Sequence, residues 1–251
     1  MDANPEASRY KKCVPIPKLM KLDLTTCLAL IRDAEEVHLP ILHYEDSLGL
    51  DSVAVYTDYS GHLIASPSLG IYSPSMSGEA PLVLSLAYPR YFMLGVDDLG
   101  HKVFAKSTTL EALGFLVPLM MDPLRFCGRE VMVVTDNAAA VIALRKGYSR
   151  GDTWATVVCR AARTVAAGIC CSLQARWEPR RSSRPTRVSD DLTHNLLTEL
   201  SSHEIEAYLS KAVVSFPEPV LQWMSAPTID YTLGLNCLKW MRLNHPILCS
   251  F

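Results

Sequence analysis

The sequence lacks any run of about 18 apolar residues, which is what a helix needs to cross a bilayer. Its first residues, MDANPEASRYKKCVPIPKLMK, also lack the apolar core of a signal peptide. We therefore expect no membrane association and a location inside the cell, in the cytoplasm or the nucleus. The 251 residues, 49% of them hydrophobic, suffice for one sizeable core with extensions.

Cysteine patterns typical of metal sites are missing too. The eight cysteines include no C-x-x-C pair, and no histidine stands where it would complete a zinc site. We interpret them as reduced, mostly buried thiols. An excess of positive charge is also absent, because 24 basic residues meet 26 acidic ones for a net charge of −2. A site for a polyanion would therefore have to be a local patch.

Three segments differ in their residue pattern. Residues 1–48 form an N-terminal segment with one predicted helix, and residues 201–251 a C-terminal helical tail interrupted by prolines. Between them, strands are expected at 51–58, 62–73, 81–89, 90–96, 101–106, 130–135 and 170–177. Helices are expected at 108–121, from 138, at 153–168 and from 189. This order indicates one α/β domain over 49–200 with a mixed sheet.

Four acidic residues have ordinary structural explanations when they are taken singly. Asp58 can stabilise a turn before Ser60 and Gly61, because aspartate bonds to backbone amides two residues on. Glu111 can complete a capping box, and Asp136 can cap the helix that follows it. Asp190 lies in the first turn of the last predicted core helix, where the helix dipole favours a negative charge.

Taken together, the four acids indicate a shared site. Asp58 and Asp136 both end apolar strands, so they meet at one edge of the sheet if those strands are parallel. Glu111 is the one charge between Thr108 and Met121, and burying a lone carboxylate is costly without a cation. Proteins usually tolerate crowded carboxylates by binding divalent cations between them. Ligands that are all oxygen atoms favour magnesium or manganese over zinc.

Four stretches resemble, in order, the four motifs of the ribonuclease H domain of retroelement reverse transcriptases. They are YTDYSG at 56–61, TLEALG at 109–114, VVTDNAAAVIALRKG at 133–147 and WEPRRSSRPTRVSDDLTH at 177–194. The last resembles the W-x-P-R and A-D-x-L-S pattern of DIRS-like elements and pararetroviruses. The similarity covers about residues 51–200. No Y-x-D-D polymerase motif accompanies it, so the chain lacks the reverse transcriptase palm.

The resemblance implies a ribonuclease H-like fold, with a mixed five-stranded sheet flanked by helices. It also implies a metal-dependent endoribonuclease that cuts the RNA strand of an RNA–DNA hybrid. Asp58, Glu111, Asp136 and Asp190 match the catalytic acids, which would hold two Mg²⁺ ions, with Mn²⁺ as a substitute. Asp191 is the alternative to Asp190 as fourth ligand. A reverse transcriptase or another retroelement protein is the implied protein partner.

The segment RWEPRRSSRPTR carries the arginines of a predicted phosphate-binding loop. Guanidinium groups bond phosphate oxygens without regard to base sequence. Hybrid recognition would rest on 2′-hydroxyl groups and groove shape, for which Asn137 and Ser60 are candidate contacts. The alternative interpretation is a solvated loop without a ligand. The five arginines of this prediction are Arg176, Arg180, Arg181, Arg184 and Arg187.

Three competing hypotheses remain. A domesticated, catalytically silent ribonuclease H-like domain that binds nucleic acid or a protein is favoured by the missing polymerase and opposed by the four retained acids. A sugar-kinase or actin-like ATPase would need paired glycine-rich phosphate loops, and the sequence offers no such pair. The tail could also be an interaction module, with Trp223 and Trp240 on a docking face. We predict the retroelement-derived ribonuclease H.

Overall fold

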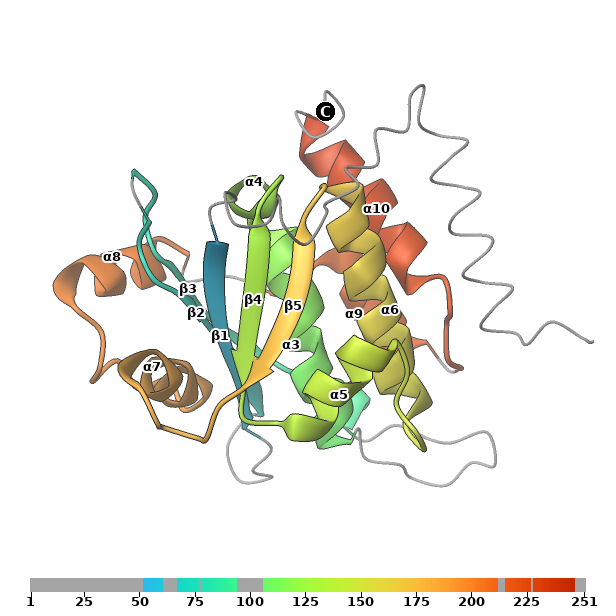
Figure 1. Ribbon diagram of the computed structural model, residues 1–251, viewed down its shortest axis with the longest axis horizontal. Coiled ribbons are helices and arrows are strands. Elements are labelled where there is room, and N and C mark those ends of the chain that lie inside the picture. The colour runs from blue at the N-terminus through green and yellow to red at the C-terminus, as the bar shows by residue number, and fades with distance from the viewer. Residues whose placement is uncertain are drawn as a thin grey trace, which may run out of the picture. The chain divides into compact units, whose positions relative to one another are not determined.

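The computed structural model describes residues 52–60, 67–76, 78–93, 106–211, 215–226 and 228–246, in which helices flank a five-stranded sheet (Figure 1). In chain order the elements are β1 (Ser52–Ser60), β2 (Ser68–Ser73), β3 (Leu82–Ala87), α2 (Arg90–Met93), α3 (Ser107–Met121), α4 (Pro123–Phe126), β4 (Glu130–Thr135), α5 (Ala138–Lys146), α6 (Thr153–Gly168), β5 (Ser172–Trp177), α7 (Arg184–Thr193), α8 (Ser202–Ser210), α9 (Glu218–Ser225) and α10 (Leu233–Asn244). The predicted segment 1–48 lies outside the described residues. The predicted domain boundaries stay predictions.

The strand order across the sheet is β3-β2-β1-β4-β5. β1 pairs with β2, and β2 with β3, in antiparallel fashion. β4 is parallel to both β1 and β5, because α3 precedes it and α5 and α6 follow it as crossover connections. The expected mixed five-stranded sheet flanked by helices is therefore confirmed.

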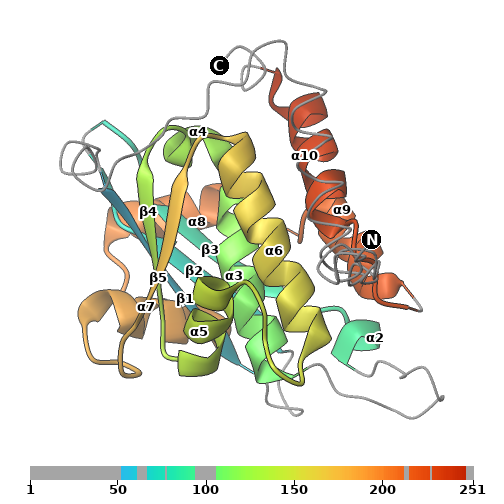
Figure 2. The same ribbon diagram turned by 45° about the vertical axis from the view of Figure 1, so that its right-hand side comes forward.

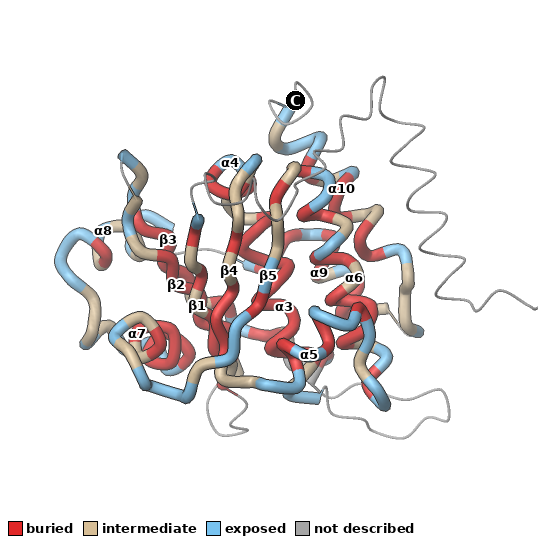
Figure 3. Tube along the Cα trace, in the orientation of Figure 1, coloured by how far each residue is buried: buried red, intermediate tan, exposed pale blue. Residues whose placement is uncertain are grey.

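Helices cover both faces of the sheet. α7 packs on β1 and β2, and α3, α5 and α6 lie on the opposite face (Figures 1 and 2). α3 is buried from Thr109 to Met120, because it lies between the sheet and α6, and this explains why its sequence is apolar all round. Burial is concentrated in the strands and in the inward sides of the helices (Figure 3). In the predicted tail, α10 packs against α6.

Two predicted elements are wrong. The strand expected at 90–96 is wrong in its described part, because residues 90–93 form α2, in which Phe92 N donates to Pro89 O and closes a helical turn. Residues 94–96 lie outside the described residues. The last core helix, α7, begins at Arg184 and not at Ser189. A capping box starts it: Ser183 and Thr186 each accept from the other's backbone N–H. The strand expected at 101–106 lies outside the described residues, apart from its last residue.

The tail residue Trp223 does not form a docking face. It is 2% exposed, in an aromatic cluster with Phe92 and Trp154, whose ring centroids lie 5.6 and 5.0 Å from its own. Among the described residues, Cys127, Cys159, Cys170, Cys171 and Cys237 are free, and Cys159, Cys171 and Cys237 are buried. Within the same residues, no helix combines the length and the apolar character that a membrane span requires.

Candidate active site

Asp58 and Asp136 reach the same edge of the sheet from parallel strands. Tyr56 on β1 pairs with Val134 on β4, and each acid follows two residues later. Asp58 is only 5% exposed. Asp136 does not cap α5, because that function belongs to Asn137, whose Oδ1 accepts from Ala140 N at 3.0 Å. The local explanation for Asp136 is therefore wrong.

Glu111 has no capping function either. The N-cap of α3 is Lys106, and no side chain caps this helix. Glu111 is 2% exposed and accepts a hydrogen bond from Thr135 Oγ1 at the end of β4, at 3.0 Å. One carboxylate oxygen from each of Asp58, Glu111 and Asp136 lies within 4.8 Å of the other two. Strand β1, helix α3 and the end of β4 thus bring three of the four predicted acids together.

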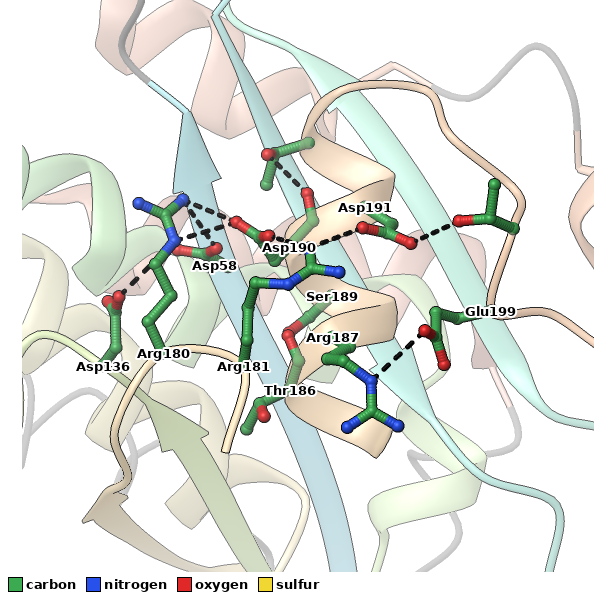
Figure 4. Close-up of polar contacts among 12 residues, drawn as sticks. Asp58, Asp136, Arg180, Arg181, Thr186, Arg187, Ser189, Asp190, Asp191 and Glu199 are labelled. Atoms are coloured by element: carbon green, nitrogen blue, oxygen red, sulfur yellow. Dashed lines mark hydrogen bonds and ion pairs between the residues drawn. The ribbon is translucent and has the colours of Figure 1, made fainter. Parts of the chain in front are cut away.

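The fourth predicted acid joins this group through an arginine (Figure 4). Asp190 is in the last part of α7, so the first-turn explanation for its charge is wrong. Arg180 Nη2 lies 2.6 Å from Asp190 Oδ1 and 3.1 Å from Asp58 Oδ2, and its Nε lies 4.0 Å from Asp136 Oδ2. Asp190 also accepts from Arg181.

Asp191, the alternative fourth ligand, has different partners. Its Oδ1 accepts from Arg181 Nη1 and its Oδ2 from Thr198 Oγ1, both at 2.7 Å. No contact between Asp191 and Asp58 or Arg180 occurs among the described residues. Asp190 is therefore the better placed of the two, since it shares a cation with Asp58 and Asp136.

Burial dominates the electrostatics of the acids. It raises the pKa of Asp58 to about 7, helped by a hydrogen bond to Asp190 and opposed by Arg180. Burial also holds the pKa of Glu111 well above its usual range, and the charges of Asp58 and Asp136 add to this effect. The pKa of Asp136 is raised, again chiefly by burial. Burial would raise the pKa of Asp190 as well, but hydrogen bonds, above all from Arg181, outweigh burial and lower this pKa.

Four of the five predicted phosphate-binding arginines form two groups. Arg180 and Arg181 lie between β5 and α7, beside the acids. Arg184 and Arg187 lie on α7 and not in a loop, and they are paired with Glu204 and Glu199 at 2.6 and 3.2 Å. Phosphate contact by this second pair would have to compete with these ion pairs.

The remaining predicted contacts come from three different elements. Arg176 on β5 is paired with Glu178 and lines a pocket of about 380 Å³ together with Arg145 and Arg163. Asn137 is the α5 cap, and Ser60 is buried at the end of β1. The role of all these residues in nucleic-acid binding stays a prediction.

Two site residues were not identified from the sequence. Thr135 donates to Glu111, and its Oγ1 accepts from Asn137 N at 3.2 Å. Trp177 Nε1 donates to the backbone O of Asp136 at 2.8 Å and so fixes the end of β4. Both residues lie within the stretches that resemble the ribonuclease H motifs. Their place in these stretches is the signal by which the sequence could have identified them.

Comparison with known proteins yields matches among solved structures. No protein-family model matches the chain, and no curated protein matches it. Matching solved structures include RNase H1 from the halophilic archaeon Halobacterium salinarum NRC-1, with 13% identity, a TM-score of 0.43, and coverage of 59% of this chain and 98% of that one. Another is the N-terminal RNase H domain of a Mycobacterium tuberculosis protein, with 13% identity, a TM-score of 0.41, and coverage of 58% and 98%. At 13% identity, neither carries an activity over to this chain.

Proposed function

We propose that the chain is a retroelement-derived ribonuclease H that cuts the RNA strand of an RNA–DNA hybrid. The observation that carries the proposal is the convergence of Asp58, Glu111 and Asp136 from three separate elements, with carboxylate oxygens within 4.8 Å of one another. None of the three is a helix cap. Two buried acids and one half-buried acid, none of which caps a helix, suit metal-dependent phosphodiester hydrolysis.

The donor set suits divalent cations. It consists of carboxylate oxygens, which magnesium and manganese prefer, and burial raises the pKa of all three acids, as expected where negative charge lacks enough positive charge. Asp58, Glu111, Asp136 and Asp190 would hold two Mg²⁺ ions, for which Mn²⁺ can substitute. Bound ions supply a nucleophilic water and stabilise the leaving 3′ oxygen.

The chain's own groups would orient the substrate. Arg180 and Arg181 carry half-exposed guanidinium groups beside the acids and would contact phosphates of the hybrid. Asn137 and Ser60 adjoin the acids in sequence and are the proposed contacts to the minor groove. A reverse transcriptase supplied by another chain would produce the hybrid.

Cleavage of an end-labelled RNA–DNA hybrid by the full chain tests the proposal. We expect cutting of the RNA strand with Mg²⁺ or Mn²⁺ and none with chelator. Asp58→Asn and Asp136→Asn should each lower the rate by about a thousandfold, because they keep the size and remove the charge. Glu206→Gln, an exposed change on α8, is the matched control and should cut normally.

The same assay separates the alternatives. Hybrid binding without cutting in any metal would favour the catalytically silent, domesticated domain. Full activity of the Asp136→Asn variant would remove this residue from the site. Comparison of Asp190→Asn with Asp191→Asn identifies the fourth ligand, and we expect the larger loss for Asp190.

A further inference from the structure

Arg180 is a cation shared by three acids of the candidate site. Its guanidinium contacts Asp58 and Asp190 at 3.1 and 2.6 Å, and it lies 4.0 Å from Asp136. It lowers the pKa of Asp58, Asp136 and Glu111 against the larger, opposite effect of burial. Figure 4 shows the side chain directed between Asp136 and the Asp58–Asp190 pair. Arg180 therefore acts as the counter-ion of this group.

Arg180 shares its carboxylates with the proposed metal site. Asp58 and Asp136 belong both to the group of oxygens within 4.8 Å of one another and to the partners of Arg180. A guanidinium and a divalent cation repel each other strongly at such short range. Both cannot keep full contact with the same two carboxylates.

The side chain of Arg180 is free to withdraw. It is 50% exposed, so its departure needs no repacking of the core. The contacts described for its guanidinium all end on carboxylates. Arg184 differs, since its guanidinium also donates to the backbone O of Glu199 and lies over the ring of Tyr72, which fixes it in place.

We propose that Arg180 is an internal counter-ion that a divalent cation displaces from Asp58 and Asp136, and that the displaced guanidinium then binds a phosphate of the hybrid. Before metal binds, the charge of Arg180 partly compensates the carboxylates of Asp58 and Asp136. Once metal is bound, the displaced guanidinium of Arg180 is available to bind a phosphate of the hybrid. This inference rests on the proposed metal site and assigns Arg180 as a positioning residue for the substrate.

Calorimetric titration of the full chain with MnCl₂ tests the first step. Arg180→Gln should bind Mn²⁺ about five- to tenfold more tightly than the wild type, because a competing charge-assisted contact is gone. Arg129→Gln is the matched control, with the same charge change on an ion-paired arginine. Arg129 precedes β4, at the end opposite to Asp136, and is paired with Glu79 at 2.8 Å, so its effect should stay within about twofold.

Displacement has a direct signature in the wild-type protein. Arg180 Nε donates to Asp190 Oδ1 at 2.9 Å, so its N–H signal in a ¹H–¹⁵N spectrum should shift and exchange faster with water on addition of Mg²⁺. The signal is assigned by its loss in Arg180→Gln. An Arg180 signal that is unchanged at saturating Mg²⁺ would overturn the inference, even if the variant binds Mn²⁺ more tightly.

The second step is tested with an unmodified RNA–DNA hybrid and Ca²⁺, a larger oxygen-preferring cation with looser coordination geometry, which should bind the acids with little cutting. Metal should raise the affinity of the wild type for this hybrid, and the gain should be several-fold smaller in Arg180→Gln. An equal gain in both proteins would overturn the phosphate contact. Absence of Mn²⁺ binding in every variant would overturn the metal site, and with it both the proposed function and this inference. Binding by the wild type without tighter binding by Arg180→Gln would overturn the inference alone.

Discussion

Glu204 is a buried carboxylate that the fold keeps charged. Burial opposes its ionisation, but hydrogen bonds from Arg184, Tyr72 and Ser201 lower its pKa to about 2. A folded-state pKa below the ordinary value means that the stabilisation is complete above about pH 4.5 and is lost as the pH falls toward 2. Glu204→Gln should therefore cost about 2 kcal/mol at pH 7, since the half-exposed Arg184 lets solvent screen the pair.

Urea denaturation at several pH values measures this effect. The difference in unfolding free energy between wild type and Glu204→Gln should shrink steadily below pH 4.5. Glu206→Gln, on the exposed side of the same helix, should match the wild type throughout. A difference that does not depend on pH would mean that packing, and not the charge of Glu204, accounts for its contribution to stability.

At the scale of single residues, the sequence predicts which residues belong to the site better than it predicts which residues they contact. Asp58, Glu111 and Asp136 could be selected because each stands alone in an apolar stretch or ends one. The partners of the arginines could not be predicted, because the pair of Arg184 with Glu204 depends on how α8 returns to α7. An arginine-rich segment looks the same in sequence whether its charges face phosphate or carboxylate.

At the scale of elements, the site depends on the close approach of α3 to β1. A Cβ atom on Gly114 would lie 2.7 Å from Thr57 Oγ1 and 2.8 Å from Thr57 Cβ. Gly114→Ala should therefore push α3 from the sheet, cost about 2 kcal/mol, and move Glu111, one turn earlier, away from Asp58. Calorimetry should show weaker Mn²⁺ binding by this variant.

A second glycine provides the control for this prediction. A Cβ on Gly168 of α6 would meet only the flexible end of the Leu238 side chain, far along the chain from the acids. Gly168→Ala can change stability but should leave Mn²⁺ affinity unaltered. Equal losses of affinity in the two variants would show that Gly114 acts through general stability and not through the position of Glu111.

Element types were more predictable than their ends. Strand β4 and helix α5 were expected because a continuous apolar run passes into an alanine-rich segment. The start of α7 was misplaced because the capping signal at Ser183 lies within the arginine-rich stretch, which was interpreted as a loop. The segment 90–96 has the composition of a strand, yet the chain turns into α2 directly after Pro89. Local propensity yields there to tertiary structure.

At the scale of the whole molecule, the acid cluster links stability to metal. Glu111 is buried, and its hydrogen bond comes from the uncharged donor Thr135, so its ionisation opposes folding when no metal is bound. Mg²⁺ should raise the melting temperature, because a ligand at about 100 times its Kd adds about 2.7 kcal/mol. The increase should be greatest at high pH, where the acids ionise.

Glu111→Gln should separate the cost of burying the Glu111 charge from the stabilisation that bound Mg²⁺ provides. In chelator at pH 8 the variant should melt at a higher temperature than the wild type, because a buried charge is replaced by an amide of similar size. Added Mg²⁺ should then raise its melting temperature much less. Circular dichroism with and without Mg²⁺ measures both values. A variant that is less stable than the wild type in chelator would mean that the charge of Glu111 is already compensated in the metal-free fold, and that metal is not what the buried acids require.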